Sequence, residues 1–256
     1  MRIDAFLTER GFFVSRNKAK ESVERGEIIF NGMVVEKPSF TVSDSDSDKI
    51  KVVKKVSEFV SIGGFKLEKA LDDFNFSVKG LVCADVGAST GGFTDCLIQR
   101  GAEKVYAIDL NDNLLSNKLK ENSAVIPIIK NARLLDKSDF PEQLDLITAD
   151  LSFISETLVI PVFSNLLSDL KHALILIKPQ FENDKKVKFK NGIISDENVI
   201  LSAIKKVALC ASDNGFSIED VTCAPKKSGK NREYLILLKK GAKNFDLEDF
   251  YGKIKL

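Results

Sequence analysis

The apolar positions beyond Ser61 follow two alternating patterns. Short, continuous apolar runs such as Val105-Tyr106-Ala107-Ile108 are separated by stretches with helical spacing, among them residues 93–100 and 196–211. Continuous runs are typical of strands that helices bury on both faces, as in a parallel sheet. We therefore predict an α/β domain with a doubly wound, mostly parallel sheet and a C-terminal antiparallel strand. The predicted parallel strands end at Asp85, Asp109, Ile129, Asp150 and Lys178, and two further strands span 216–223 and 233–238.

The first sixty residues have a different pattern, which predicts a small α+β domain at 1–60 in front of a large domain at 61–256. Helical spacing stops at Gly11 and again at Gly26, and glycine is common just past a helix end. Asn31-Gly32 separates two short apolar runs and suits the positive φ angles of a type I′ hairpin turn. The predicted elements are helices at 1–10 and 15–25, strands at 28–30, 33–35 and 50–53, and a polar loop at 43–48.

Residues 85–94 read DVGASTGGFT and join a predicted strand to a predicted helix. A phosphate loop of the Walker type needs a lysine where Phe93 stands, so the main charge for a nucleotide triphosphate is missing. The dinucleotide fingerprint needs a glycine where Ser89 stands. S-adenosylmethionine fits better, because it has no phosphate and needs close backbone approach plus acidic groups, here Asp85 and Asp109. The alternative interpretation is a glycine turn beside two exposed aspartates.

Polar residues at the predicted strand ends suggest the chemistry, because the carboxyl ends of parallel strands meet at one edge of a sheet. Asp109 follows an apolar run, where a carboxylate can accept from two ribose hydroxyls. Lys178 follows another run, and loss of hydration there favours the neutral amine that can act as a base. Asp150 could keep this lysine oriented. Methyl transfer to a hydroxyl needs positioning and proton removal, which amines and carboxylates supply.

The composition excludes several other classes of site. His172 is the only histidine, which argues against zinc hydrolases and Ser-His-Asp catalysis. The single histidine and the spacing of the cysteines also lead us to expect no metal. No stretch of eighteen apolar residues exists, and the N-terminus does not resemble a signal peptide, so we expect a cytoplasmic protein. The cysteines form no C-x-x-C pair and are expected to be reduced core residues: Cys83, Cys96, Cys210 and Cys223.

The formal net charge is only +1, yet two stretches are strongly basic. Residues 221–240 hold six Lys or Arg against one Glu, and residues 184–190 hold four Lys against one Asp. Such stretches either bind nucleic acid or form ordinary solvated faces. As RNA contacts they offer Lys185, Lys186, Lys226, Lys227 and Lys230.

Motifs along nearly the whole chain resemble the TlyA, or hemolysin A, family. They occur in the family's order: SIGGFKL at 61–67, DVGASTGGFT at 85–94, NAR at 131–133, ADLSFIS at 149–155, KPQFE at 178–182, GII at 192–194 and NREY at 231–234. The resemblance implies a Rossmann-like class I methyltransferase domain of the FtsJ type. It also implies 2′-O-methylation of ribosomal RNA, with cytidine as the expected nucleotide. The small domain resembles the RNA-binding domain named after the fourth ribosomal protein of the small subunit.

The family resemblance also implies residue roles. A Lys-Asp-Lys-Glu tetrad falls on Lys66, Asp150, Lys178 and Glu233, with Lys178 as proton acceptor or steerer of the ribose hydroxyl. The expected S-adenosylmethionine site comprises Asp85, Gly87, Ser89, Thr90, Gly91, Gly92, Asp109, Asn131 and Arg133. The small domain would contact ribosomal RNA or ribosomal subunits through Arg16, Lys18, Lys20 and Arg25.

Two residues depart from the family pattern. Ile62 stands where relatives commonly carry arginine, and Lys230 stands where a glycine usually precedes the asparagine. They leave open a catalytically impaired protein that still binds ribosomes or RNA. A membrane-lytic protein is a further alternative, suggested by the family's name, but the sequence offers no long apolar or strongly amphipathic basic helix.

Overall fold

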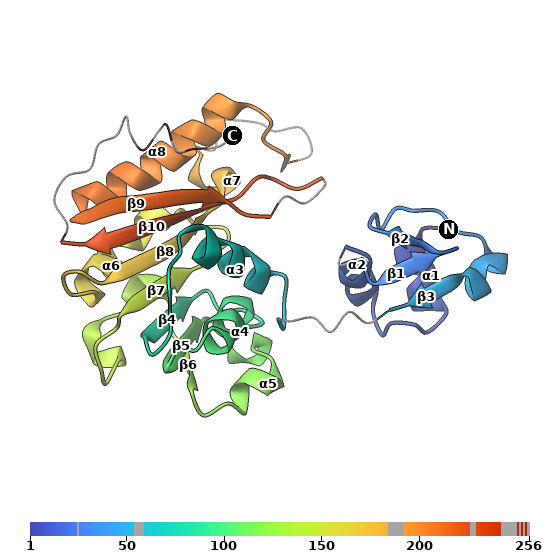
Figure 1. Cartoon of the computed structure of the whole chain (residues 1–256), viewed down its shortest axis with the longest axis horizontal. Helices are drawn as coiled ribbons and strands as arrows, with labels where there is room; N and C mark the ends of the chain where they lie inside the picture. Colours follow the sequence, from blue (N-terminus) through green and yellow to red (C-terminus); the bar gives the residue numbers. More distant parts are fainter. Residues whose placement is uncertain are drawn as a thin grey trace. The chain divides into compact units, whose positions relative to one another are not determined.

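The chain divides into two compact units, Met1–Glu58 and Phe59–Leu256 (Figure 1). The computed structural model describes residues 1–24, 26–53, 59–183, 192–225 and 229–241, together with 250, 252 and 254. The division falls after residue 58, whereas the sequence pattern placed it after residue 60. Each unit has a hydrophobic cluster of its own.

The small unit packs two helices against a three-stranded antiparallel sheet. Its elements are α1 (Ile3–Glu9), α2 (Arg16–Glu24), β1 (Ile28–Phe30), β2 (Met33–Val35), η1 (Asp44–Lys49) and β3 (Ile50–Val52). The hairpin turns at Asn31 and Gly32, whose φ angles of 49° and 83° confirm the predicted turn. The stretch predicted as a polar loop is instead the 3-10 helix η1. The Ser43 N–H donates to Asp46 at 2.8 Å, which satisfies a backbone donor at its start.

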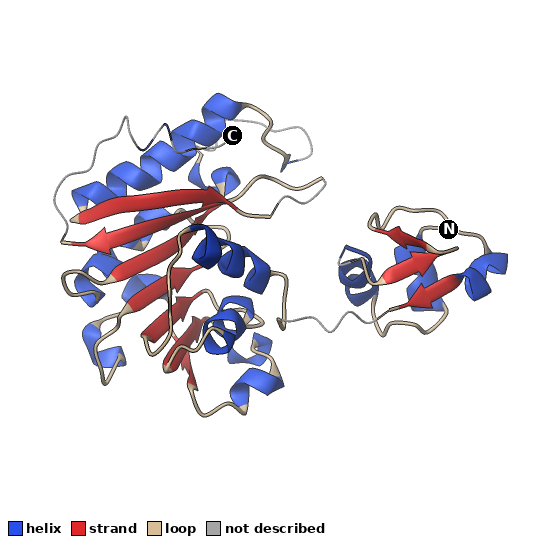
Figure 2. Ribbon diagram, viewed as in Figure 1, coloured by secondary structure: helices blue, strands red, loops and turns tan. Residues whose placement is uncertain are grey.

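The large unit is built on a seven-stranded sheet (Figure 2). Its strands are β4 (Val82–Val86), β5 (Lys104–Asp109), β6 (Val125–Ile129), β7 (Leu146–Ala149), β8 (His172–Ile177), β9 (Phe216–Cys223) and β10 (Tyr234–Lys240). They lie in the order β6-β5-β4-β7-β8-β10-β9. The first five are parallel, and β10 is antiparallel to both neighbours. The predicted mostly parallel sheet with a C-terminal antiparallel strand is confirmed.

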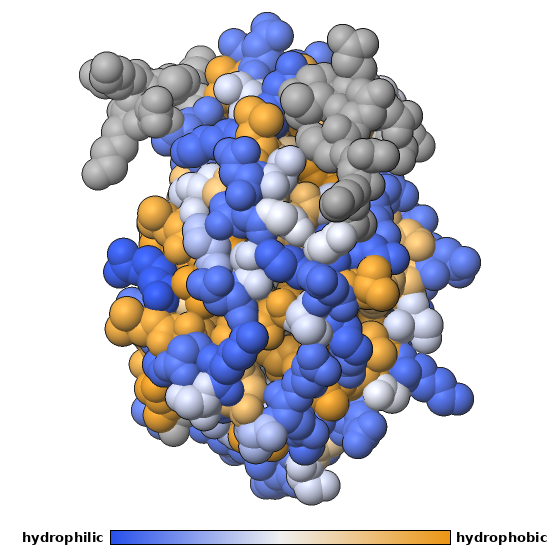
Figure 3. Space-filling model, turned by 90° about the vertical axis from the view of Figure 1, so that its left-hand side faces the viewer, coloured by the Kyte–Doolittle hydropathy of each residue, from blue (hydrophilic) through white to orange (hydrophobic). Residues whose placement is uncertain are grey.

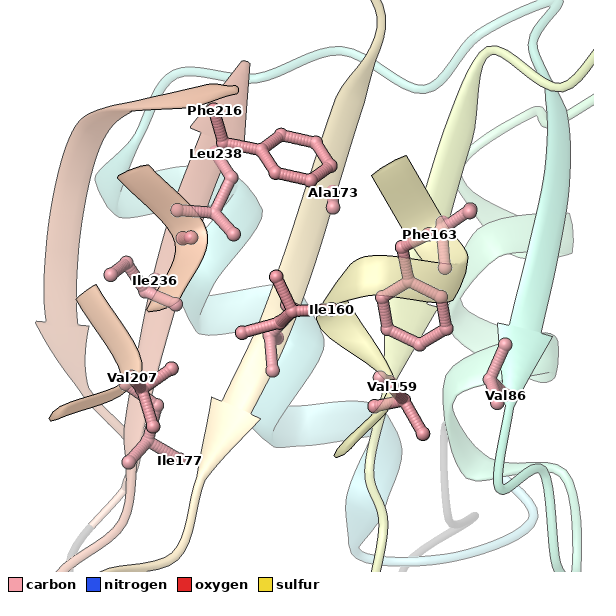
Figure 4. Packing of buried hydrophobic residues seen from close by; sticks show 14 of the residues in the cluster. Val86, Val159, Ile160, Phe163, Ala173, Ile177, Val207, Phe216, Ile236 and Leu238 are labelled. Carbon is pink, nitrogen blue, oxygen red and sulfur yellow. The ribbon is translucent and has the colours of Figure 1, made fainter. Parts of the chain in front are cut away.

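Helices cover both faces of this sheet. They are α3 (Gly63–Asp73), α4 (Gly92–Gln99), α5 (Asn117–Lys120), α6 (Ile160–Leu166), α7 (Pro179–Glu182) and α8 (Glu197–Asp213), with the 3-10 helices η2 (Asp112–Leu114), η3 (Ala132–Leu134), η4 (Lys137–Asp139) and η5 (Glu156–Leu158). Leu174 and Leu176 of β8 pack with α3 and α4. Ile175 and Ile177 face the opposite layer, with α6 and α8. Figure 4 shows Ile177 in this layer, together with Phe163 of α6 and Val207 of α8. Because both sides of the strand are buried, its sequence is a continuous apolar run.

The parallel strands bring the predicted polar residues to one edge of the sheet. Asp109 is the last residue of β5, Asp150 follows β7, and Lys178 follows β8. Strands β7 and β8 are direct neighbours, with Ala149 paired to Ile175. Strand β4 runs one residue past Asp85 to Val86, so Asp85 lies within the strand and not at its end.

Hydrophilic residues cover much of the face drawn in Figure 3, and hydrophobic residues are interspersed among them. Within the described ranges, no helix combines the length and apolar character needed to cross a bilayer.

Candidate active site and cofactor pocket

The loop after β4 is held close to two other segments, and its glycines make this approach possible. A Cβ at Gly87, whose φ is 85°, would lie 2.9 Å from the Asp150 carbonyl oxygen. A Cβ at Gly92 would lie 2.2 Å from the Ser61 Oγ atom and 3.0 Å from the Gly64 nitrogen. The glycines therefore let the loop pack against both the end of β7 and the start of α3.

A cavity of about 580 Å³ opens beside this loop at the ends of β4, β5 and β7. The Asp109 carboxylate lies at its wall and accepts the N–H groups of Ser89 at 2.8 Å and Leu110 at 2.7 Å. These two bonds fix the carboxylate while leaving lone pairs for a ligand hydroxyl. The other predicted cofactor residues in the wall are Gly87, Ser89, Asn131 and Arg133, and the apolar part includes Ile108, Leu110, Leu114, Leu151 and Phe153.

A second cavity, of about 220 Å³, adjoins the first and is lined by three of the four predicted catalytic residues, Lys66, Asp150 and Lys178. Gly87, Ser89, Asp150 and Ser152 line both cavities, so the two spaces meet at the glycine loop. Lys66 and Lys178 line only the smaller one, together with Ser61, Ile62, Gly63, Thr90 and Gly92. A ligand in the large cavity would thus have its loop-facing end beside two lysines.

The four residues of the predicted tetrad lie together, although they come from four segments of the chain. The Asp150 carboxylate lies between two lysines, with Lys178 Nζ at 2.5 Å and Lys66 Nζ at 3.7 Å. Glu233 pairs with the far side of Lys66 at 2.6 Å. Lys66, Asp150 and Glu233 have side chains 16%, 21% and 21% exposed, so the charges are paired yet open to a substrate. The two cations and two anions balance formally.

Lys178 is held more tightly than its partners, because its side chain is only 9% exposed. Its Nζ also donates to the Ser152 Oγ atom at 2.8 Å. The Phe181 ring lies 6.0 Å from this nitrogen, at the limit of a cation–π contact. An ammonium has three N–H donors, so the hydrogen bond to Ser152 and the ion pair with Asp150 leave Lys178 able to donate to a substrate oxygen.

Asp85 departs from the predicted position. It is fully buried beneath the loop and lines neither cavity. Burial raises the pKa of Asp85 to about 7, against the opposing effect of the hydroxyls of Thr94 at 2.6 Å and Thr148 at 3.2 Å, which donate to its carboxylate. The alternation of β4 sends this side chain into the interior beside Thr148, its partner on β7. Asp85 therefore supports the loop from below, through its bonds to Thr94 and Thr148, and its predicted contact with a cofactor stays a prediction.

Gly91 also lies away from both cavities. Its φ is 94°, and a Cβ there would lie 2.2 Å from a methyl carbon of Leu119. The residue is thus needed for the turn and for packing against α5.

The side chains predicted to contact RNA in the small unit differ in whether they are already paired with an acidic residue. Arg16 pairs with Asp4 at 3.2 Å, and the Asp4 side chain is only 3% exposed. Lys20 lies 4.0 Å from Glu24, whereas Lys18 is exposed. In the large unit Lys230 is exposed, directly before Asn231. Five predicted contacts lie outside the described residues: Arg25, Lys185, Lys186, Lys226 and Lys227.

Two residues at the site were not singled out from the sequence. Ser152 holds Lys178, and Phe153 is 87% exposed at the wall of the large cavity, with φ at 69°. A positive φ is rare for a bulky residue and marks a position that the surrounding structure constrains. The Phe181 ring lies 5.2 Å from that of Phe153. Ser152 and Phe153 both fall within the ADLSFIS motif. The motif indicated that this segment belongs to the site, but it did not single out either residue.

Comparison with known proteins decides the family. The family model described as FtsJ-like methyltransferase matches residues 59–240, and the family model of the S4 domain matches residues 1–48. The chain belongs to the FtsJ-like methyltransferases. The predicted resemblance to the TlyA, or hemolysin A, family is thereby confirmed.

Relatives of this methyltransferase carry two kinds of name. This chain is 39% identical to Hemolysin A of Brachyspira hyodysenteriae, over 92% of its own length and 98% of that protein. It is 35% identical to the 16S/23S rRNA (cytidine-2′-O)-methyltransferase TlyA of Mycobacterium tuberculosis, over 93% of this chain and 89% of that one. A solved structure from Streptococcus thermophilus that bears the name hemolysin is 35% identical, with a TM-score of 0.74 over 96% of this chain and 91% of its own. An S-adenosylmethionine-dependent methyltransferase from Mesorhizobium loti, 15% identical with a TM-score of 0.51 over 67% of this chain and 96% of its own, shares the fold.

S-adenosylmethionine is the cofactor of this methyltransferase, and the residues present fit it. The large cavity has the size of a small-molecule site, and its apolar wall suits a base while Asp109 suits ribose hydroxyls. Gly87 lines the cavity and, because it has no Cβ, lets the loop lie against Asp150 at the end of β7. All four cysteines are free, with Cys83 and Cys96 buried. The described part of the chain holds no group of three His, Cys, Asp or Glu side chains that could bind a metal.

Proposed function

We propose that this methyltransferase transfers a methyl group from S-adenosylmethionine to the 2′-hydroxyl of a cytidine in ribosomal RNA. The observation that supports this acceptor best is the paired Lys178 and Asp150, 2.5 Å apart, in the cavity that adjoins the cofactor pocket. A hydroxyl must lose its proton as it attacks carbon, and such a pair can orient the oxygen and take up the proton. The TlyA relatives, named as 2′-O-methyltransferases of cytidine, support the same acceptor.

In this mechanism the cofactor supplies an electrophilic methyl group, and the chain's own residues place the ribose oxygen in line with it. Lys178 donates to the 2′-oxygen and stabilises the negative charge that develops there. The hydroxyl proton passes to the Lys178–Asp150 pair and from there to solvent. Lys66 holds Asp150 from the opposite side and is itself held by Glu233. The products are a 2′-O-methyl ribose and S-adenosylhomocysteine.

The cofactor would be held by the residues that line the two cavities. We assign direct contacts to Gly87, Ser89, Thr90, Gly92, Asp109, Asn131 and Arg133. Asn131 is also the N-cap of η3, where its side chain accepts the Arg133 N–H at 3.0 Å, so it fixes this wall of the pocket.

The complete tetrad favours an active enzyme over a catalytically impaired RNA-binding protein. Glu233 reaches Lys66 at 2.6 Å even though Lys230 replaces the usual glycine three residues earlier. Ile62 lies at the N-cap of α3 and lines the small cavity, where it offers no charge to a phosphate. We therefore expect the Ile62 departure to weaken RNA contact and to leave the chemistry intact.

The decisive experiment maps 2′-O-methyl groups on ribosomal RNA from cells with and without this protein, and then on purified subunits incubated with the enzyme and S-adenosylmethionine. We expect one or a few cytidines to lose the modification without the protein and to regain it in vitro. Identical maps in both cells, with no transfer in vitro, would refute the proposal. Release of dye from liposomes by nucleic-acid-free protein would instead favour the lytic activity that the hemolysin name suggests.

A further inference from the structure

Two buried carboxyl groups lie behind the Lys178–Asp150 pair, outside the proposed tetrad. Glu156 is the first residue of η5, Glu182 is the last of α7, and each is 2% exposed. Glu156 belongs to the segment that begins with Asp150, and Glu182 to the segment that begins with Lys178. Buried acids are rare unless something in the structure compensates for them.

Hydrogen bonds through these carboxyls join the two strand-end segments. The Glu156 N–H donates to Glu182 at 2.8 Å, and the Ser155 hydroxyl donates to the other oxygen of Glu182. The Leu151 N–H, directly after Asp150, lies close enough to the Glu156 carboxyl to lower its pKa slightly. Lys206 of α8 donates to the Glu182 carbonyl at 2.8 Å and fixes the end of α7. The segment carrying Asp150 and the segment carrying Lys178 are therefore fastened to each other at this point.

The two carboxyls have different surroundings. Glu182 receives two donors, which suits a carboxylate. The Glu156 Oε2 atom is buried and has no hydrogen-bond partner among the described residues, which suits a neutral acid. Burial, followed by the proximity of Glu182, raises the pKa of Glu156 well above its usual value, Lys178 opposes the rise, and Asp150 adds to it. Burial also raises the pKa of Glu182. The hydrogen bonds from Ser155 and from the Glu156 N–H, and the charge of Lys206, oppose this rise. The Cys210 thiol lies nearby.

We propose that Glu156 and Glu182 carry one proton between them, held on Glu156, and act as positioning residues that fix Asp150 relative to Lys178. This inference rests on the proposed methyl transfer for its effect on rate, but not for the proton itself. Loss of the proton would put a second negative charge into a buried site, where Lys178 is already paired with Asp150. The segment after Asp150 would then shift, and a shift of reacting groups by about 1 Å can lower a rate on the order of a hundredfold.

The proton can be tested without any activity. The full-length protein, labelled with carbon-13 at glutamate carboxyls, is titrated by NMR, and the Glu156→Gln variant assigns the resonance. We expect the Glu156 carboxyl to remain protonated well above the pH at which ordinary glutamates ionise, about 4.3. Ionisation of Glu156 near that ordinary pH would overturn the proposal.

The positioning role is tested by the rate of methyl transfer against pH. Glutamine imitates a neutral acid, so Glu156→Gln should stay within about threefold of the wild-type kcat near neutral pH and keep its rate at alkaline pH, where wild type declines. Glu156→Ala should lower kcat on the order of tenfold to a hundredfold, with little change in KM for S-adenosylmethionine. Glu121→Gln, at an exposed acid of the same unit, is the matched control and should follow wild type.

The outcomes separate the two proposals. Parallel pH profiles for wild type and Glu156→Gln, or an unchanged kcat in Glu156→Ala, would overturn the positioning role while wild type still methylates RNA. A wild-type protein that methylates no RNA would refute the proposed function, and the NMR titration would still decide where the proton resides.

Discussion

Lys178 is the residue on which the proposed chemistry depends most directly, because it is the most buried member of the tetrad and holds two partners. Lys178→Ala should bind S-adenosylmethionine and RNA as wild type does, while turnover falls on the order of a hundredfold to ten-thousandfold. Single-turnover transfer with labelled cofactor measures the loss, and calorimetry measures cofactor binding. Lys171→Ala is the control, since Lys171 also pairs with an aspartate, Asp145, beside the opposite end of β8. Near-normal turnover in Lys178→Ala would contradict its role.

Phe153 is expected to contact the RNA base at the target position. An aromatic ring that is 87% exposed in a constrained backbone beside the cofactor pocket can stack on a base turned out of the RNA. Phe153→Ala should lower kcat/KM for RNA by about tenfold to a hundredfold, since stacking contributes about 1–3 kcal/mol per base. Phe153→Leu keeps the apolar surface and should recover only part of the loss. The folded state should be unaffected, and an unchanged kcat/KM for RNA in Phe153→Ala would rule out stacking.

Asp85 makes the stability of the large unit depend on pH. Its pKa is raised to about 7 by burial, whereas an unfolded chain ionises it near 3.8. Stability from the neutral form is therefore complete below about pH 4 and is lost as the pH rises through about 7. The asparagine of the Asp85→Asn variant cannot ionise. As the pH rises from 4 to 8, the free energy of unfolding of wild type should therefore fall relative to that of the variant by up to about 4 kcal/mol. Denaturant unfolding of both proteins at several pH values measures this, and a constant difference would contradict the prediction.

At the scale of secondary-structure elements, the start of α4 must approach the start of α3 closely. Gly92→Ala places a Cβ within 2.2 Å of Ser61 Oγ and 3.1 Å of the Gly63 Cα atom, so the loop and α3 must separate. We expect a loss of about 1–3 kcal/mol in stability and weaker S-adenosylmethionine binding.

Gly63→Ala is the matched control for this element. Gly63 is likewise the first residue of its helix, but a Cβ there meets nothing closer than 3.4 Å. Thermal unfolding and calorimetric titration compare the two variants. Equal effects of the two substitutions would show that the close approach at Gly92 is unimportant.

At the scale of the whole molecule, we predict that RNA affinity and methyl transfer are separable between the two units. Replacing Arg16, Lys18 and Lys20 together by alanine should weaken RNA binding and flatten its salt dependence, each lost phosphate contact removing roughly 0.7–0.9 from the log–log slope. Arg16 also pairs with buried Asp4, so the double variant of Lys18 and Lys20 separates RNA contact from the stability of the small unit. Cofactor affinity should stay the same. Lys49→Ala, which removes an exposed lysine paired with Asp46, serves as control. An unchanged salt slope in the double variant would contradict this division of roles.

The sequence by itself determined the architecture of the large unit, because a strand buried on both faces is apolar along most of its length. The run at Ala173 to Ile177 and its polar end at Lys178 could be recognised for that reason. The Asn31-Gly32 turn was equally legible, since few residues adopt two successive positive φ angles. The tetrad came from the family's motifs, and the sequence pattern alone showed only that Asp150 and Lys178 end neighbouring elements.

Only the tertiary structure decided which groups meet across the chain. The pairing of Lys66 with Glu233, the burial of Asp85 and the contact of Glu156 with Glu182 each depend on the order of strands in the sheet and on where each strand stops. Asp85 shows the reason most clearly. Strand β4 continues one residue past Asp85, so its carboxyl is enclosed within the sheet beside Thr148 of β7, and only the pairing of the two strands shows this.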